Sequence, residues 1–126
     1  MPRFPAGTTG RVIKPYQQPY PDPLKVRAGD KVFPDHTQES DWPGWVWCAS
    51  ETGKAGWAPQ AWLTHRDDGW HITRDYDAIE LTVRIGDPVT IEFAESGFLW
   101  VRLLNGQWGW VPESHVEFLA PAAQDL

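Results

Sequence analysis

The sequence predicts an all-β protein made of two small five-stranded barrels in tandem. Twelve Pro and eleven Gly are spread through the 126 residues, which favours short strands and turns over long helices. Apolar side chains alternate with polar ones at 81–85 and 89–93, as in strands that bury one face. A set of short segments also occurs twice in the same order, and this indicates two copies of one module.

Four pairs of segments form the internal repeat. In chain order they are VIKPY at 12–16 with ITRDY at 72–76, LKVRAGD at 24–30 with LTVRIGD at 81–87, Trp45-Val46 with Trp100-Val101, and GWAP at 56–59 with GWVP at 109–112. The offset falls from 60 to 57, then to 55 and 53. Because loops vary in length more than strands do, we interpret this fall as three residues lost early in the second copy and two shorter loops further on.

The repeat also predicts where the modules begin and end. We expect one barrel at 10–64 and a second at 70–119, with a linker at 65–69 and flexible termini at 1–9 and 120–126. Each module then has about five short strands in roughly 50 residues, and a sheet that small must close on itself to bury a core. Asn105-Gly106 and Thr52-Gly53 are the expected hairpin turns.

The repeated segments resemble the Src-homology-3 (SH3) family. Its pattern has a start motif ending in Asp-Tyr, a Leu-x-Φ-x-x-Gly-Asp turn, a Trp-Trp strand, and a Gly-Φ-Φ-Pro segment followed three residues later by Tyr. The resemblance implies a groove of aromatic rings that binds proline-rich peptide in its extended helix. Carried over by position, the groove residues are Tyr16, Trp45, Pro59 and Trp62 in the first copy and Tyr76, Trp100, Pro112 and His115 in the second.

Two departures from the family pattern affect this groove. The first Tyr of the start motif is replaced by Lys14 in one copy and Arg74 in the other, and His115 stands where a Tyr is expected. We therefore expect a mostly intact proline pocket in the first copy and an eroded one in the second. These departures are similar to those of variant SH3 modules in bacterial proteins.

Strand alternation separates groove rings from core residues. Val follows both Trp45 and Trp100 and takes the apolar face, which turns these two rings outward. Trp57 and Trp110 fit either packing or a groove, and Trp42, Trp47 and Trp70 are expected to be interface or core-edge residues between the copies. Cys48 is expected to be a small buried hydrophobe.

Several function classes are excluded at this stage. The net charge of −6 argues against nucleic-acid binding and against docking on anionic membranes. The segment 1–10 lacks the apolar core of a secretory signal and there is one cysteine, so a cytoplasmic location is expected. Catalytic motifs, metal-ligand spacings and cofactor fingerprints are not found, so we expect no enzyme activity, no metal and no cofactor.

The leading hypothesis is therefore a non-catalytic adaptor that binds a protein through a proline-rich or basic peptide. Residues 70–119 carry an acidic excess of five charges, which would favour a basic partner there. One alternative is a structural or oligomerisation module, including a homo-oligomer, with the aromatics buried between the barrels. Another is binding of a small cationic ligand in an aromatic cage.

Overall fold

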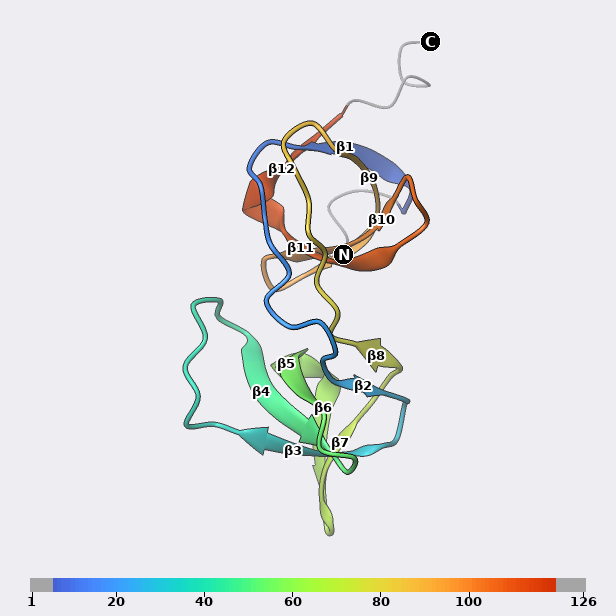
Figure 1. The fold of residues 1–126 in the computed structure, drawn as a ribbon. Helices are drawn as coiled ribbons and strands as arrows, with labels where there is room; N and C mark the ends of the chain where they lie inside the picture. The colour runs from blue at the N-terminus through green and yellow to red at the C-terminus, as the bar shows by residue number, and fades with distance from the viewer. Residues whose placement is uncertain (1–5, 120–126) are drawn as a thin grey trace. The chain divides into compact units, whose positions relative to one another are not determined.

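A computed structural model describes residues 6–119, and these form an all-β fold, as the sequence predicts. Two five-stranded antiparallel sheets and one two-stranded sheet account for its strands (Figure 1). Two single-turn 3₁₀ helices complete the regular structure. Within residues 6–119 there is no helix long and apolar enough to cross a membrane.

The chain forms two compact units, and they do not correspond to its N-terminal and C-terminal halves. Unit 1 combines the residues up to Pro19 with those from Glu80 onward, and unit 2 is the intervening segment Tyr20–Ile79. The expected barrels at 10–64 and 70–119 differ from these units, because residues 10–19 belong with the second half and 70–79 with the first.

Unit 1 is built on a sheet with the strand order β11-β10-β9-β1-β12. Its elements are β1 (Thr8–Val12), β9 (Pro88–Glu95), β10 (Phe98–Leu103), β11 (Trp108–Pro112), the 3₁₀ helix η2 (Glu113–His115) and β12 (Val116–Phe118). The alternating apolar side chains of these strands meet in a core of Val12, Leu81, Val83, Val89, Ile91, Leu99, Val101, Val111 and Val116.

Unit 2 is built on a sheet with the strand order β5-β4-β3-β7-β6, together with the pair β2-β8. Its elements are β2 (Lys25–Val26), β3 (Lys31–Asp35), β4 (Trp45–Ser50), β5 (Ala55–Pro59), the 3₁₀ helix η1 (Gln60–Trp62), β6 (Leu63–Arg66), β7 (Gly69–Ile72) and β8 (Tyr76–Asp77). Leu24, Val32, Val46, Cys48, Ala58 and Ile72 are buried in this unit.

The start motifs have exchanged places between the two sequence copies. β1 pairs with β9 and β12, so the first start motif completes unit 1, and Figure 1 shows this blue strand among the late strands of the chain. β7 pairs with β3 and β6, so the second start motif completes unit 2. In a sequential arrangement each unit would take its first strand from its own copy. Here each unit takes that strand from the other copy.

Equivalent backbone hydrogen bonds show that the two start motifs occupy corresponding positions in their units. In unit 1 the Val12 N–H donates to the Asp87 carbonyl at 2.9 Å, and the Gly86 N–H donates to the Val12 carbonyl at 2.8 Å. In unit 2 the Ile72 N–H donates to the Asp30 carbonyl at 3.0 Å, and the Gly29 N–H donates to the Ile72 carbonyl at 2.7 Å.

The expected linker at 65–69 is part of a β-hairpin. β6 ends at Arg66 and β7 begins at Gly69, and the two strands pair directly. Gly69 has φ 121°, a backbone conformation that glycine adopts without strain, and this allows the two-residue turn. Of the expected flexible termini, 1–5 and 120–126 lie outside the described residues, while Thr8 and Thr9 are already in β1.

Strand register also corrects the interpretation of the loops. Trp45 lies opposite Pro59, and Phe98 lies opposite Pro112, so Trp45 corresponds to Phe98 rather than to Trp100. The hairpin turns have the same length, since the Ser50 N–H donates to the Lys54 carbonyl as the Leu103 N–H does to that of Gln107. The two shorter loops inferred from the sequence are therefore one, between β9 and β10.

Candidate peptide-binding grooves

The exchange regroups the predicted groove residues. Tyr76 packs edge-on against Trp62 of the first copy, with ring centroids 5.5 Å apart and an interplanar angle of 87°. Tyr16 packs edge-on against His115 of the second copy, at 5.6 Å and 89°. The sequence had placed Tyr16 in one groove with Trp62, and Tyr76 in the other with His115. The two candidate grooves thus hold Trp45, Pro59, Trp62 and Tyr76 in unit 2, and Tyr16, Pro112 and His115 in unit 1.

The unit 2 groove is built around buried rings. Trp45 is half-buried on β4 opposite Pro59, which leads directly into η1 and places Trp62. Trp62 and Tyr76 are only 7% and 5% exposed. The Tyr76 hydroxyl donates to the Trp57 carbonyl at 2.5 Å, which fixes its ring. Trp45 is therefore the most exposed of these three rings.

Arg74 covers the face of Trp62. Its guanidinium carbon lies 3.9 Å from the Trp62 ring centroid, well within the range of a cation–π contact. The Arg74 side chain is exposed, although the ring below it is buried. The residue that replaces the first Tyr of the start motif thus supplies a stacked cation in place of a ring.

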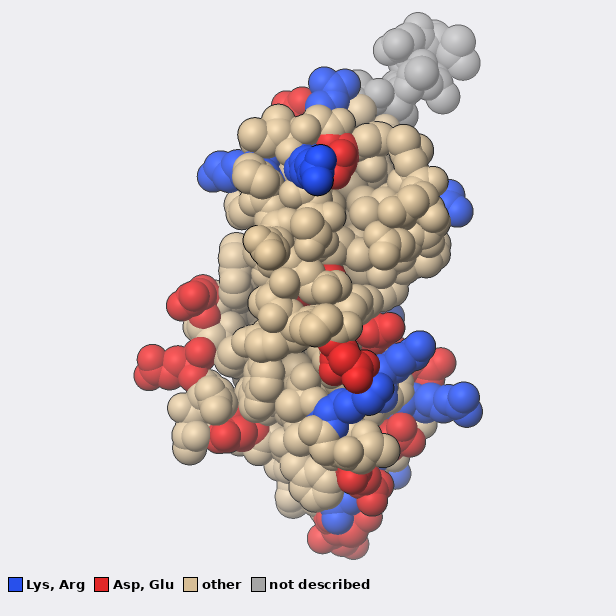
Figure 2. All heavy atoms as spheres, in the orientation of Figure 1, with Lys and Arg blue, Asp and Glu red and all other residues tan. Residues whose placement is uncertain are grey.

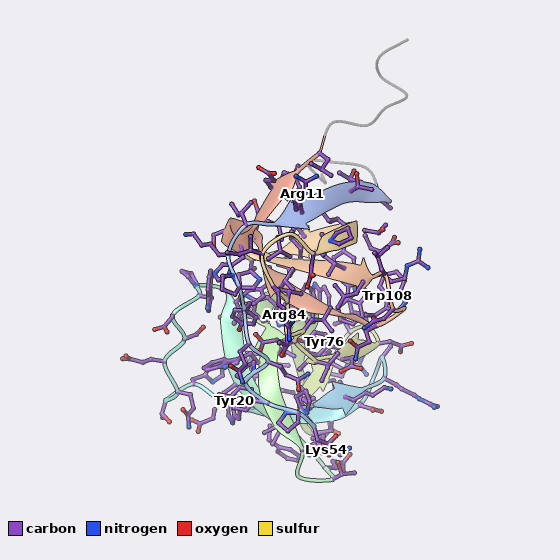
Figure 3. All side chains as sticks on the ribbon, turned by 45° about the horizontal axis from the view of Figure 1, so that its top comes forward. Arg11, Tyr20, Lys54, Tyr76, Arg84 and Trp108 are labelled. Carbon is purple, nitrogen blue, oxygen red and sulfur yellow. The ribbon has the colours of Figure 1, made fainter. Side chains whose placement is uncertain are left out.

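The unit 1 groove has a different set of residues. Phe98 is buried and lies opposite Pro112, in the register position that Trp45 holds in unit 2. Trp100, predicted for this groove, lies one pair further along β10, opposite Trp110. It stacks on Trp108 at 6.2 Å with an interplanar angle of 16°. Trp108 itself is exposed at the beginning of β11 (Figure 3).

Glu80 is a candidate groove residue that the sequence reasoning missed. The Tyr16 hydroxyl donates a hydrogen bond to its carboxylate, and the Gln18 side-chain amide donates to its carbonyl at 2.7 Å. Burial raises the pKa of the Glu80 carboxyl, and the Tyr16 hydrogen bond opposes that shift. The sequence offered one signal for Glu80. It directly precedes the repeated Leu81, at a position where the first copy has Pro23.

His115 adds a second polar group beside Tyr16. Its Nδ1 atom is buried and has no hydrogen-bond partner among residues 6–119. Its backbone carbonyl accepts the Ile13 N–H at 2.8 Å, which ties η2 to the end of β1. Because a buried polar atom without a partner is costly, the packing of unit 1 around His115 leaves one hydrogen bond unmade.

Catalytic or metal-binding chemistry finds little support in the described part of the chain. Cys48 is fully buried, and burial raises the pKa of its thiol to about 12, which leaves it protonated and unreactive near neutral pH. The residues that the structure describes contain no group of three or more His, Cys, Asp or Glu side chains that could hold a metal ion.

The acidic excess is divided between the units. Residues 20–79 hold ten acidic and six basic side chains, a net charge of −4, and residues 6–19 with 80–119 hold six and four, a net charge of −2. In Figure 2, acidic and basic side chains are interspersed over unit 2. The sequence placed the larger acidic excess in the second copy, at 70–119. With the start motifs exchanged, the larger excess lies in unit 2.

A comparison with protein families identifies a domain class for part of the chain. The model of the variant SH3 domain matches residues 9–65, so a single variant SH3 domain is found in that segment. SH3 domains are generally non-catalytic binding modules, and the match supports a binding role for this chain in that general sense. No curated protein and no solved structure matches the chain.

Proposed function

We propose that this chain is a peptide-binding adaptor composed of two SH3-like barrels that have exchanged their start motifs. The observation that carries the proposal is the same tyrosine contact in both units, at 5.6 Å to His115 and 5.5 Å to Trp62. In each unit this contact lies beside a buried proline that ends a strand, Pro112 or Pro59. Rings next to a proline form the kind of surface on which an extended proline-rich segment packs.

The unit 1 groove supports a ligand with a basic residue. Glu80 and His115 both contact Tyr16, through a hydrogen bond to its hydroxyl and an edge-on ring contact respectively. When Glu80 is ionised, it attracts a Lys or Arg side chain of a peptide whose proline packs on Tyr16. The cytoplasmic location stays a prediction from the sequence.

The test measures binding of fluorescent proline-rich dodecapeptides that carry an Arg residue, by fluorescence anisotropy. We expect His115→Ala or Glu80→Gln to weaken binding by about tenfold, the effect of losing one charge-assisted or buried hydrogen bond. Trp108→Ala serves as the control, because this ring is exposed and lies at the opposite end of β11 from Pro112. Absence of binding by the wild-type protein, or an equal loss in the control, would refute the assignment.

A small cationic ligand is the second candidate function, and Glu80 is the observation that favours it. A carboxylate bonded to the Tyr16 hydroxyl and next to an aromatic face can hold an ammonium group without any peptide. Titration with tetramethylammonium separates the two functions. Saturable quenching of intrinsic fluorescence that is lost in Glu80→Gln, without peptide binding, would favour the small ligand.

A further inference from the structure

Corresponding rows of side chains cross the outer faces of the two five-stranded sheets, and they differ in size. In unit 2, Phe33 on β3 lies opposite Ala49 on β4, which lies opposite Ala55 on β5. Counted from the two hairpin turns of equal length, the same positions of unit 1 on β9, β10 and β11 hold Thr90, Arg102 and Trp108. The unit 2 row is therefore bulky at its first strand and low at the other two, and the unit 1 row is the reverse.

Both rows are open to solvent. Strand alternation turns them away from the cores, since the preceding residues Val32 and Val101 are buried. Phe33 is 48% exposed and Trp108 is 38% exposed. Trp108 also continues the apolar surface to Trp100, on which it stacks. Contiguous exposed apolar surface of this kind is characteristic of an interaction site, unlike single scattered side chains.

The unit 1 row carries a positive charge. Arg102 is the only charged residue of the hairpin Phe98–Pro112. Its guanidinium carbon lies 5.6 Å from the Trp108 ring centroid, and it forms no ion pair within residues 6–119. The hairpin therefore presents an aromatic ring beside a cation that no carboxylate neutralises, and Trp and Arg are the residues that most often anchor protein interfaces.

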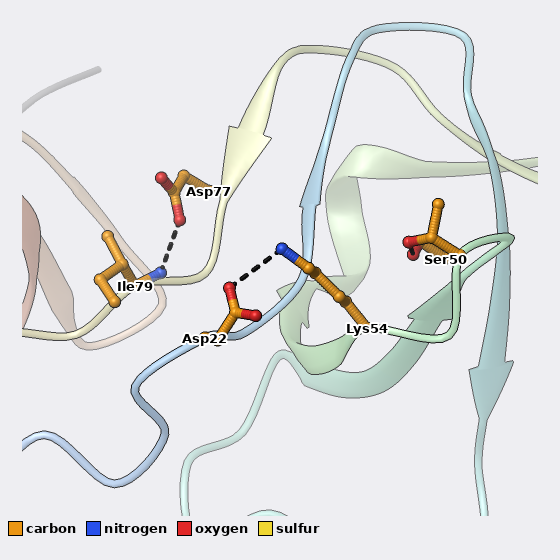
Figure 4. A network of polar contacts seen from close by, with 6 residues as sticks. Asp22, Ser50, Lys54, Asp77 and Ile79 are labelled. Carbon is orange, nitrogen blue, oxygen red and sulfur yellow. Dashed lines mark hydrogen bonds and ion pairs between the residues drawn. The ribbon is translucent and has the colours of Figure 1, made fainter.

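The unit 2 row lies in a negatively charged unit, since residues 20–79 have a net charge of −4. Lys54, next to the row, is paired with Asp22 at 3.0 Å (Figure 4). The ammonium group of Lys31 is directed to the Phe33 ring, 5.7 Å from its centroid. This row thus leaves room for larger side chains in a unit whose net charge attracts a cation.

We propose that the chain associates with a second copy of itself, and that the unit 1 row of one copy packs face to face on the unit 2 row of the other. With β9 stacked over β3, every large side chain of one row meets a small one of the other, as in Trp108 over Ala55. Both halves of this fit belong to one chain, so the partner it defines is a second copy. The net charge of −6 repels at long range, but physiological salt screens that repulsion beyond about 8 Å, and at contact Arg102 meets the negative unit.

Sedimentation equilibrium of the full chain, from micromolar to near-millimolar concentration, tests the proposal with two variants. Trp108→Ala and Ala49→Arg each introduce the residue that the other unit carries at the same register position, so both are compatible with the sheet. We expect the average mass of the wild-type protein to rise with concentration. Each variant alone should associate about thirtyfold more weakly, the effect of losing or obstructing a central aromatic contact.

An equimolar mixture of the two variants is the decisive sample. Each variant retains the row that the other has lost, so the mixture should recover association, and that recovery also shows that both variants are folded. Ile85→Ala is the control and should associate as the wild type does, because Ile85 is 69% exposed in unit 1 but lies outside both rows. A monomeric wild-type protein, an equal loss in Ile85→Ala, or no recovery in the mixture overturns the proposal.

Discussion

Replacing Gly10 by Ala tests the exchange of start motifs through a steric overlap. A Cβ atom at Gly10 would lie 2.7 Å from Cγ1 of Val116 and 3.0 Å from the Glu117 carbonyl oxygen, both on β12. The first distance is well below the roughly 3.5–4.0 Å of a favourable contact between carbon atoms. Val116 is a short side chain and Glu117 contributes backbone, so neither can move aside cheaply.

The expected cost follows from overpacking. Adding a methyl group to a filled site costs typically about 1–3 kcal/mol of unfolding free energy. For a unit of this size, that corresponds to a fall of about 4–24 °C in the melting temperature of unit 1. The measurement is thermal and urea unfolding of the full chain, followed by tryptophan fluorescence, since both units contain tryptophan.

The sequential arrangement predicts the opposite sign. There Gly10 would occupy the place of Trp70 opposite His65, where an indole is accommodated, and Ala would stabilise the strand by roughly 0.5–1 kcal/mol. Thr9→Ala, a change at the exposed neighbouring residue of β1, should stay within about 0.5 kcal/mol. Gly10→Ala should also cost less in a Val116→Ala background. A stable Gly10→Ala protein, or an equal cost in both backgrounds, would refute the pairing of β1 with β12.

Three further predictions follow from named contacts. Cysteines at Arg11 and Glu117, which lie opposite each other, should form an intramolecular disulfide, whereas cysteines at Arg11 and Thr64, the pair that the sequential arrangement brings together, should not, as mass spectrometry of the oxidised chain will show. The Gly29 carbonyl and the Asp68 carboxylate raise the pKa of His71, so its stabilising effect is complete below its ordinary pKa of 6.5 and is lost as the pH rises through the higher folded value; His71→Gln should flatten that part of the curve of unfolding free energy against pH. The native Cys48 thiol should react with a disulfide reagent only on unfolding, and rapid reaction in the native protein would contradict its burial.

The fold class could be predicted because local patterns specify strands and turns. Alternation at 89–93 identifies a strand in β9, and the turn at Asn105-Gly106 lies between β10 and β11 as expected. Gly29 and Gly86 both have φ above +90°, which agrees with the two repeated Gly-Asp turns. Each of these features depends on a few neighbouring residues, so one sequence is sufficient to detect it.

The grouping of the site residues could not be predicted in the same way. Both start motifs end in Tyr and make the same backbone bonds to a Gly-Asp turn, so neither turn distinguishes one motif from the other. The sequence matched Trp100 with Trp45, whereas the strand register matches it with Trp47. Both Trp45 and Trp47 are followed by a residue of the core face, so the sequence offers two tryptophans for one match. The choice depends on contacts far apart in the chain, which local patterns do not contain.

Side-chain size at one position gives a physical reason for the exchanged arrangement. Gly10 and Trp70 are equivalent residues, each two positions before its start motif, and they lie opposite Phe118 and His65 respectively. Trp70 packs on His65 at 5.0 Å and on His36 at 6.0 Å, two rings that unit 2 supplies. In unit 1 the place of Trp70 would lie against Val116, where even a Cβ atom overlaps. Only the segment that carries Gly therefore fits unit 1 without strain, and the segment that carries Trp gains its ring contacts in unit 2. The exchange satisfies both, and it brings Tyr16 beside Glu80 and Arg74 onto Trp62, so the charges of the two grooves are a consequence of the same choice.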